Sequence, residues 1–139
     1  MSNEKNRMCE VVLKVPFHDL DPLQMVWHGN YLKYFDIARS ALFVQGGVDL
    51  FDYFKTTNCL FPLIKTSTKY VASLRYLDEF KSIATVVEAQ YKIVIDFEIR
   101  LLKNNQICAR GRSEQVAVRH PGMEIMFEIP GDIRTALGY

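Results

Sequence analysis

The 139-residue chain has few of the residues that mark several common kinds of site. It contains only three cysteines, Cys9, Cys59 and Cys108, which are widely spaced and form no Cys-x-x-Cys pair. An odd, scattered set argues against a disulfide framework or a zinc site, and it predicts reduced, mostly buried thiols. The three histidines are scattered too. We therefore expect no bound metal and no cofactor.

The chain also has little net charge and no long apolar run. The 17 basic residues nearly balance the 16 acidic ones, for a formal net charge of +1. This balance gives no reason to expect nucleic acid or an anionic membrane as a partner. No apolar run is long enough to cross a bilayer, and the polar stretch 1–10 does not look like a signal peptide, so we expect a cytoplasmic protein. The G-x-S-x-G elbow of serine hydrolases and a glycine-rich phosphate loop are both absent.

What the chain does have is apolar content, at 49% hydrophobic against 24% charged residues. Its length predicts one domain, residues 1–139, with a buried core. Apolar residues recur at helical spacing between residue 30 and Gly46, at Tyr31, Tyr34, Phe35, Ala38, Ala41 and Leu42. This pattern predicts an amphipathic helix of about four turns. A second short helix is expected at residues 48–54.

The rest of the sequence reads as β-structure. Strands are predicted at residues 8–16, 60–72, 82–92, 94–103 and 107–119, with a hairpin turn at Asn104-Asn105. A final short strand is expected at residues 123–129, and a helical turn at residues 130–137. One helix with several antiparallel strands is an α+β domain. Because one helix cannot cover both faces and the edges of a five-stranded sheet, we expect a homodimer or a homotetramer.

The most informative segment runs from Phe17 to Tyr31, with the sequence FHDLDPLQMVWHGNY. Two acids lie in a turn-like stretch, a Trp-His pair follows, and the helix begins directly after it. A helix start offers unpaired backbone N–H groups and the positive end of the helix dipole. A carboxylate facing that end can attack a carbonyl, or activate water against it, while the N–H groups hold the carbonyl oxygen. The segment therefore suggests acyl-transfer chemistry.

This segment resembles the signature of the 4-hydroxybenzoyl-CoA thioesterase-like enzymes of the hotdog fold. In that family an Asp-x-Asp stretch, followed by Val-aromatic-His/Tyr-x-x-Tyr, leads into the central helix. The later stretch 74–80, LRYLDEF, is similar to the family's Arg-Tyr-Gly-Asp-Glu turn. The resemblance covers nearly the whole chain. It implies one long central helix packed on about five antiparallel strands, and the hydrolysis of an acyl-CoA thioester.

Residue by residue, the resemblance implies that Asp21 is the catalytic carboxylate, acting as nucleophile or as general base to water. His28 stands at the helix start and is a second catalytic candidate through its side chain. The backbone N–H groups of His28 and Gly29 would form the oxyanion site. Asp19 matches a less critical acid, which we expect to hold the loop in place, and Asn30 is a plausible N-cap.

Three further residues are predicted to bind substrate. Trp27 and Tyr31 flank the helix start, and Lys92 is the single basic residue where some relatives have a cluster that binds the phosphates of coenzyme A. The chain also departs from the family, since Gln24 and Leu77 stand where glycine is usual. Gln24 suggests a differently shaped loop and a different acyl pocket.

Two alternatives stay open at this point. Because only one lysine represents the phosphate-binding cluster, the substrate could be an acyl-carrier-protein thioester, for a thioesterase or a tailoring enzyme. The chain could also be a non-catalytic module that binds acyl thioesters. The presence of Asp21 argues against the second alternative, because a pure binder needs no carboxylate beside the scissile bond.

Overall fold

The computed structural model describes residues 4–139. Short 3-10 turns cover Glu4–Arg7 and Phe17–Asp19. The other elements, in chain order, are β1 (Met8–Lys14), α1 (Asn30–Gln45), α2 (Leu50–Thr57), β2 (Cys59–Leu60), β3 (Leu63–Tyr70), β4 (Glu79–Glu88), β5 (Ile93–Leu101), β6 (Ile107–Gln115), β7 (Val118–Arg119), β8 (Glu124–Ile125) and α3 (Gly131–Ala136). No helix in this part of the chain has the length and apolarity needed to cross a membrane.

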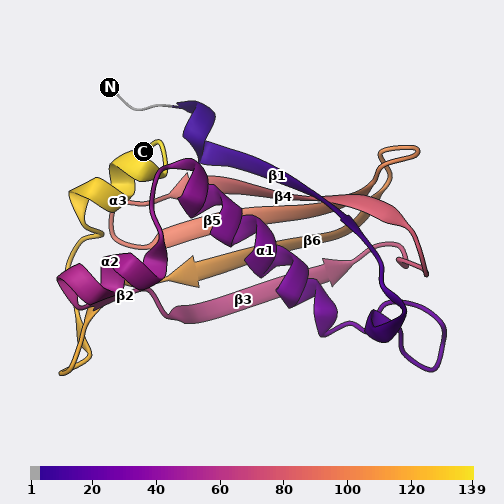
Figure 1. The fold of residues 1–139 in the computed structure, drawn as a ribbon, viewed down its shortest axis with the longest axis horizontal. Coiled ribbons are helices and arrows are strands. Elements are labelled where there is room, and N and C mark those ends of the chain that lie inside the picture. The colour runs from indigo at the N-terminus through magenta and orange to yellow at the C-terminus, as the bar shows by residue number, and fades with distance from the viewer. Residues whose placement is uncertain (1–3) are drawn as a thin grey trace.

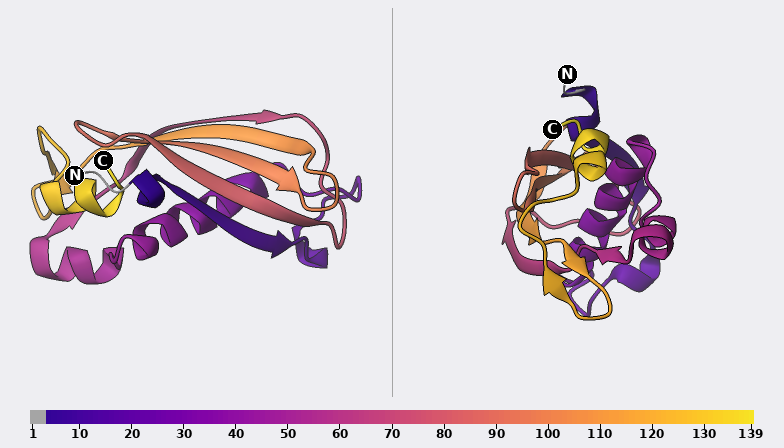
Figure 2. Two further views of the ribbon diagram at one scale, coloured as in Figure 1. Left: turned by 90° about the horizontal axis from the view of Figure 1, so that it is seen from above. Right: turned by 90° about the vertical axis from the view of Figure 1, so that its left-hand side faces the viewer.

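Five strands form one antiparallel sheet in the order β1-β4-β5-β6-β3. The long helix α1 runs across one face of this sheet (Figures 1 and 2). This arrangement confirms the predicted α+β hotdog fold. A small sheet, β2-β7-β8, lies with α2 and α3 near the C-terminal end of α1, whereas the loop between β1 and α1 lies at the opposite end (Figure 1).

The packing of α1 follows from two sequence periods. Buried and half-exposed residues alternate strictly along β5, as they do in a strand with one face on the core. The predicted helical stripe of α1 is buried against that face. Phe35 stacks on Phe97 with ring centroids 4.7 Å apart. A Cβ on Gly111 would lie 2.5 Å from the Phe35 ring, so glycine is what allows this close approach.

Several strand and helix boundaries differ from the predicted ones. The strand expected at 60–72 is divided into β2 and β3, since Pro62 between them has no N–H to offer a ladder. The strand expected at 107–119 is likewise divided into β6 and β7. The second helix begins at residue 50 because the Asp49 side chain accepts from the N–H groups of Phe51 and Asp52. The hairpin at Asn104-Asn105 is confirmed, with Asn105 at a φ of 59°.

One capping prediction is wrong. The residue before α1 is Gly29, and Asn30 is the first residue of the helix. The Asn30 side chain instead donates a hydrogen bond to the Asp19 carbonyl over 2.9 Å. Asn30 therefore ties the loop to the helix start and leaves the helix N–H groups uncapped by a side chain.

Candidate functional site

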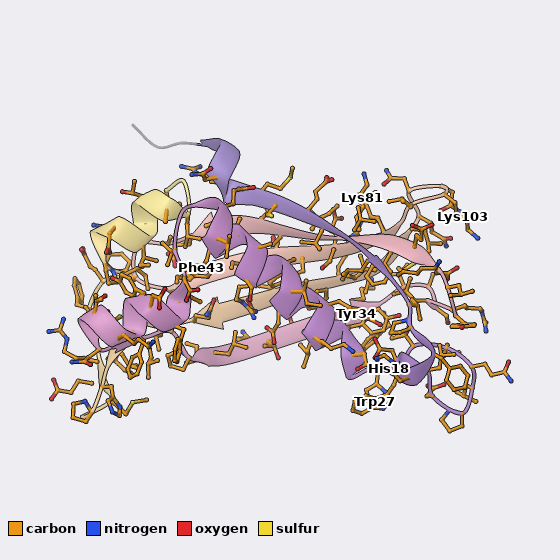
Figure 3. All side chains as sticks on the ribbon, viewed as in Figure 1. His18, Trp27, Tyr34, Phe43, Lys81 and Lys103 are labelled. Carbon is orange, nitrogen blue, oxygen red and sulfur yellow. The ribbon has the colours of Figure 1, made fainter. Side chains whose placement is uncertain are left out.

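The loop between β1 and α1 carries both acids of the predicted motif. It folds back on itself through an isolated bridge between Leu20 and Val26. A second bridge joins Met25 to Arg75, in the turn before β4. Trp27 closes the loop by donating its backbone N–H to the Asp19 carbonyl over 3.0 Å. These contacts hold the loop against the N-terminal end of α1, where His18, Trp27 and Tyr34 gather (Figure 3).

Asp19 is buried, with 3% of its surface exposed. Its carboxylate accepts from the Tyr34 hydroxyl and from the Lys33 ammonium, each over 2.6 Å. Burial alone would raise the pKa of Asp19, but the hydrogen bonds from Lys33 and Tyr34 outweigh burial and hold the pKa below its ordinary value. The same carboxylate, together with burial, raises the pKa of Tyr34 well above its usual range. Both oxygens of Asp19 are thus engaged with α1.

Asp21 has different surroundings. Its Oδ1 accepts from the backbone N–H of Leu23, over 2.8 Å, in a local turn. Among residues 4–139, no group donates a hydrogen bond to its Oδ2. Asp21 is half-buried and lines an open pocket of about 650 Å³. The other residues around this pocket are Phe17, Leu20, Pro22, Gln24, Arg75 and Tyr76. Of the two acids, Asp21 is therefore the one that a ligand can reach.

Unpaired N–H groups lie at the start of α1. Asn30 donates its backbone N–H to the Trp27 carbonyl over 2.9 Å. The N–H groups of His28 and Gly29 make no hydrogen bond within the described part of the chain. The Trp27 ring packs over Gly29 so closely that a Cβ there would lie 2.2 Å from a ring carbon. These two N–H groups, at the positive end of the helix dipole, can hold a developing oxyanion.

The aromatic side chains beside this helix start form a continuous cluster. The exposed His28 ring lies 5.0 Å from the Trp27 ring, centroid to centroid, and 6.4 Å from the Tyr70 ring. Tyr70 donates its hydroxyl hydrogen to the His28 carbonyl over 3.1 Å. Tyr31 is only 3% exposed and packs edge-on against Tyr70, with centroids 5.1 Å apart. Tyr31 therefore supports the site from the core, while Trp27 and His28 face outward.

Lys92 does not join this group. It directly precedes β5, which starts at the end of the sheet where α1 terminates, whereas the loop between β1 and α1, which carries Asp21, lies at the end where α1 begins (Figure 1). The 16 residues of α1 separate the two ends by about 24 Å. Lys92 also pairs with Glu114 over 2.7 Å, and this hydrogen bond raises the pKa of the lysine. Within one chain, Lys92 and Asp21 therefore do not form a single site.

Arg75 and Tyr76 were not among the predicted site residues, although both belong to the LRYLDEF stretch that resembles the family turn. The structure brings them beside Asp21 through the bridge from Met25 to Arg75. Two stretches of the sequence resemble family motifs, residues 17–31 and 74–80. An interpretation that placed these two stretches side by side could have identified Arg75 and Tyr76. Phe17 contacts Tyr76 edge-on, with ring centroids 5.9 Å apart, and completes an aromatic wall of the pocket.

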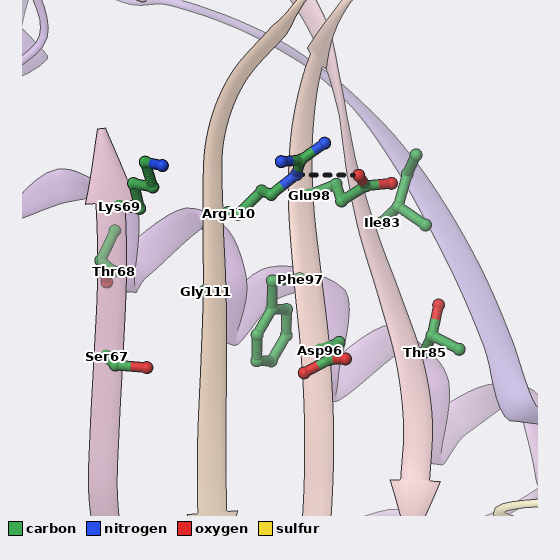
Figure 4. Close-up of a pocket in the computed structure, with 10 residues that line it drawn as sticks. All are labelled: Ser67, Thr68, Lys69, Ile83, Thr85, Asp96, Phe97, Glu98, Arg110 and Gly111. Carbon is green, nitrogen blue, oxygen red and sulfur yellow. Dashed lines mark ion pairs between the residues drawn. The ribbon is translucent and has the colours of Figure 1, made fainter. Parts of the chain in front are cut away.

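A second hollow, of about 600 Å³, lies on the face of the sheet away from α1 (Figure 4). Its acids are engaged by neighbouring arginines. Glu98 pairs with Arg110 over 3.6 Å, and Asp96 pairs with Arg112 over 2.6 Å. Because each carboxylate faces a guanidinium on an adjacent strand, this hollow offers a neutralised surface. Asp21, by contrast, has no ion pair within the described residues.

Comparisons with known proteins point to one family. The model of a family described as the thioesterase-like superfamily matches residues 15–137. A protein of Synechocystis sp. whose name marks it as an inferred esterase is 26% identical over 130 residues, which cover 92% of this chain and 77% of that protein.

Solved structures show the same fold. A 1,4-dihydroxy-2-naphthoyl-CoA thioesterase from Synechocystis superposes with a TM-score of 0.87 at 19% identity, over 94% of this chain and 95% of that one. A 4-hydroxybenzoyl-CoA thioesterase, in an Asp-to-Asn variant complexed with 4-hydroxybenzoyl-CoA, superposes with a TM-score of 0.85 at 18% identity. That match covers 94% of this chain and 99% of the other.

Proposed function

Because the chain belongs to the thioesterase-like superfamily, we propose that it hydrolyses acyl-CoA thioesters and that Asp21 supplies the catalytic carboxylate. One observation carries this proposal. Of the two acids in the loop, Asp19 is held by Lys33 and Tyr34, whereas Asp21 opens onto a pocket, and the same loop leads into the start of α1 with its free N–H groups. Carboxylate and oxyanion donors are the two parts that acyl transfer requires.

In the proposed reaction the thioester carbonyl lies between Asp21 and the N–H groups of His28 and Gly29. As negative charge develops on the carbonyl oxygen, these N–H groups stabilise it without having to reorganise. Asp21 either attacks the carbonyl carbon or removes a proton from the attacking water. The first route expels the coenzyme A thiolate and forms a mixed anhydride that water then cleaves. The second route forms the acid and the thiol in a single addition and elimination.

For the substrate, an acyl or aroyl thioester of coenzyme A is favoured by the names of the structural relatives, which act on aroyl-CoAs. The carrier-protein alternative keeps one supporting observation. Lys92, the predicted phosphate ligand, is already paired with Glu114, so a coenzyme A phosphate would have to compete for it. Arg75, which lines the Asp21 pocket, is the basic residue closer to the reaction.

We also propose that the active protein is a dimer built on the edge strand β3. Leu63 and Ile64 at its start are about half exposed, and an unpaired edge is a template for a second strand. Tyr70 at the end of β3 contacts His28, so a partner strand laid along β3 would lie against the helix start. The site would then sit at the subunit boundary.

A hydrolysis screen tests the substrate class. Aroyl-, short-chain and long-chain acyl-CoAs are incubated with the protein, and acyl-carrier-protein thioesters carrying the same acyl groups are assayed in parallel. The proposal predicts thiol release from the coenzyme A series with a higher kcat/KM than from the carrier series. Hydrolysis of the carrier series alone would favour the alternative, and no hydrolysis of either would contradict the proposal.

A further inference from the structure

Two backbone peptide groups supply the N–H groups that are proposed to hold the thioester oxygen. The N–H of His28 belongs to the peptide that carries the Trp27 carbonyl, and the N–H of Gly29 belongs to the peptide that carries the His28 carbonyl. A trans peptide is planar, and its N–H and C=O point in opposite directions. A group that holds one of these carbonyls therefore also fixes the direction of the N–H behind it.

The two carbonyls are held in different ways. The Trp27 carbonyl accepts from the backbone N–H of Asn30 over 2.9 Å, within the turn that opens α1. The His28 carbonyl accepts from the backbone N–H of Tyr31 over 3.4 Å, which is longer than the usual distance of about 2.7–3.2 Å. The Tyr70 hydroxyl is a nearer donor to it, at 3.1 Å. A side chain from β3, 42 residues away in the sequence, thus holds this second peptide.

Tyr70 is itself fixed in place. Its backbone pairs with Ala109 in the register between β3 and β6. Its ring packs edge-on against the ring of the buried Tyr31, with centroids 5.1 Å apart, and the His28 ring lies 6.4 Å away. These contacts orient the Tyr70 hydroxyl before any substrate binds. Such preorganisation is what makes a hydrogen-bond donor effective toward charge that develops during a reaction.

We propose that Tyr70 is a positioning residue, which aims the Gly29 N–H at the thioester oxygen. This inference rests on the proposed function. The Tyr70 hydroxyl has one hydrogen and donates it to the His28 carbonyl, on the side of the peptide opposite to the N–H. Tyr70 therefore acts through the peptide and does not touch the reacting atoms. A hydrogen bond to the carbonyl also polarises the peptide and makes its N–H a stronger donor.

Tyr70→Phe tests this role, because it keeps the ring and removes the hydroxyl. The substrate is the acyl-CoA that has the highest kcat/KM in the hydrolysis screen. We expect kcat to fall roughly tenfold with little change in KM, since the N–H remains but is less well aimed. Loss of an oxyanion donor itself costs more, about a hundredfold or beyond.

Tyr53→Phe is the matched control. The Tyr53 hydroxyl donates to Asp132 over 3.0 Å, at an exposed contact between α2 and α3, near the end of α1 that is away from the site (Figure 1). Each variant loses one tyrosine hydroxyl and one exposed hydrogen bond, so both should unfold close to the wild-type temperature. Tyr53→Phe should keep the wild-type kcat. Both are assayed at a concentration at which light scattering gives them the wild-type mass.

A vibrational measurement separates the aim of the N–H from general effects on stability. The same acyl-CoA, labelled with carbon-13 at its thioester carbonyl, is bound to Asp21→Asn, in which we expect hydrolysis to be slow. A hydrogen bond to the carbonyl oxygen weakens the C=O bond and lowers its stretching frequency. The lowering should be smaller when Tyr70→Phe is added to Asp21→Asn, and it should be unchanged when Tyr53→Phe is added.

Three results would overturn this inference alone. A kcat of Tyr70→Phe equal to that of Tyr53→Phe would show that the hydroxyl has no part in the reaction. A loss of about a hundredfold or more would make the Tyr70 hydroxyl itself a donor to the substrate. A lower kcat with an unchanged carbonyl frequency would separate Tyr70 from the Gly29 N–H. Failure of the wild type to hydrolyse any acyl-CoA would instead contradict the proposed function.

Discussion

The hydroxyl of Tyr34 on α1 donates a hydrogen bond of 2.6 Å to the buried carboxylate of Asp19 in the preceding loop. This contact, with the ion pair from Lys33, uses Asp19 to fix the loop on the helix. Asp21 follows two positions later in the same loop, and its carboxylate accepts from the Leu23 N–H instead of from α1. The two acids therefore differ in their surroundings, and the roles that we propose for them rest on this difference.

Tyr34→Phe should lower the free energy of unfolding by about 1.5–3 kcal/mol, because it removes one donor from a buried charge. Chemical denaturation measures the change. Tyr53→Phe is the matched control, since the Tyr53 hydroxyl donates to Asp132 over 3.0 Å at an exposed position. Its cost should stay below about 1 kcal/mol. Equal costs for the two variants would contradict the anchoring role of Asp19.

Asp19 should also make stability depend on pH in a defined direction. The pKa of aspartate in an unfolded chain is about 3.9, and the folded-state pKa of Asp19 lies lower. Proton binding therefore favours the unfolded chain. The stability that Asp19 contributes is complete above about pH 5 and is lost as the pH falls through the folded-state pKa. Unfolding curves of wild type and Asp19→Asn should differ most near neutral pH and converge in acid, and a constant difference would contradict this.

Two positions where glycine is usual in the family carry a left-handed backbone here. Gln24 has a φ of 63° and Leu77 a φ of 65°. Gln24 thus keeps a backbone that glycine favours, and the departure consists of a side chain on the wall of the Asp21 pocket. Leu77→Gly should raise the free energy of unfolding by about 0.5–1 kcal/mol, because relief of the left-handed strain exceeds the entropy cost of glycine.

The control for Leu77→Gly is Leu102→Gly, at another exposed turn position whose φ is not positive. That change should lower the free energy of unfolding, since it brings the entropy cost of glycine without relieving strain. Thermal unfolding of the two variants measures whether each change raises or lowers the stability. A loss of stability in Leu77→Gly as large as that in Leu102→Gly would show that the leucine at 77 is unstrained.

Ile64→Lys should break the proposed dimer, because it places a charge on the exposed start of the edge strand β3. Light scattering at micromolar concentration should show a dimer or tetramer for the wild type and a smaller species for the variant, with loss of hydrolysis. Val12→Lys changes a residue of similar exposure on β1, the opposite edge, and should keep the assembly. A stable wild-type monomer would contradict the proposal.

Much of this molecule follows from its sequence, because the informative patterns are local. The spacing of Tyr31, Tyr34 and Phe35 predicts α1, and Asn104-Asn105 predicts a hairpin. The family match confirms the predicted class of thioester hydrolase. The features that the sequence does not predict depend on pairing between strands that are far apart in the sequence. Lys92 reads as a free cation until the sheet register places it beside Glu114.

Arg39 is a similar case, because it is buried and its Nε has no hydrogen-bond partner in the part of the chain that the structure describes. A charged residue on a helix reads as a solvent-facing one, since buried arginine is uncommon. Only the path of β6 beneath α1 encloses it against Ser113. By contrast, the division of β2 from β3 at Pro62 could have been read from the sequence, because proline is confined to edges and breaks of strands.

The role of Asp21 is the central claim, and Asp21→Asn tests it most directly. The change is nearly isosteric and leaves the turn acceptor for the Leu23 N–H in place, so the fold should survive. With the nucleophile or base removed, kcat for the best acyl-CoA of the screen should fall by at least about a hundredfold, with little change in KM. His28→Ala should lose less, because its backbone N–H remains.

Asp19→Asn provides the comparison within the same loop and should slow turnover far less than Asp21→Asn, at a greater cost in stability. The measurement is therefore the kcat of folded Asp21→Asn, checked by circular dichroism, beside that of Asp19→Asn. We predict a loss of at least about a hundredfold that is confined to the Asp21 variant. Near wild-type turnover by folded Asp21→Asn would contradict the catalytic assignment.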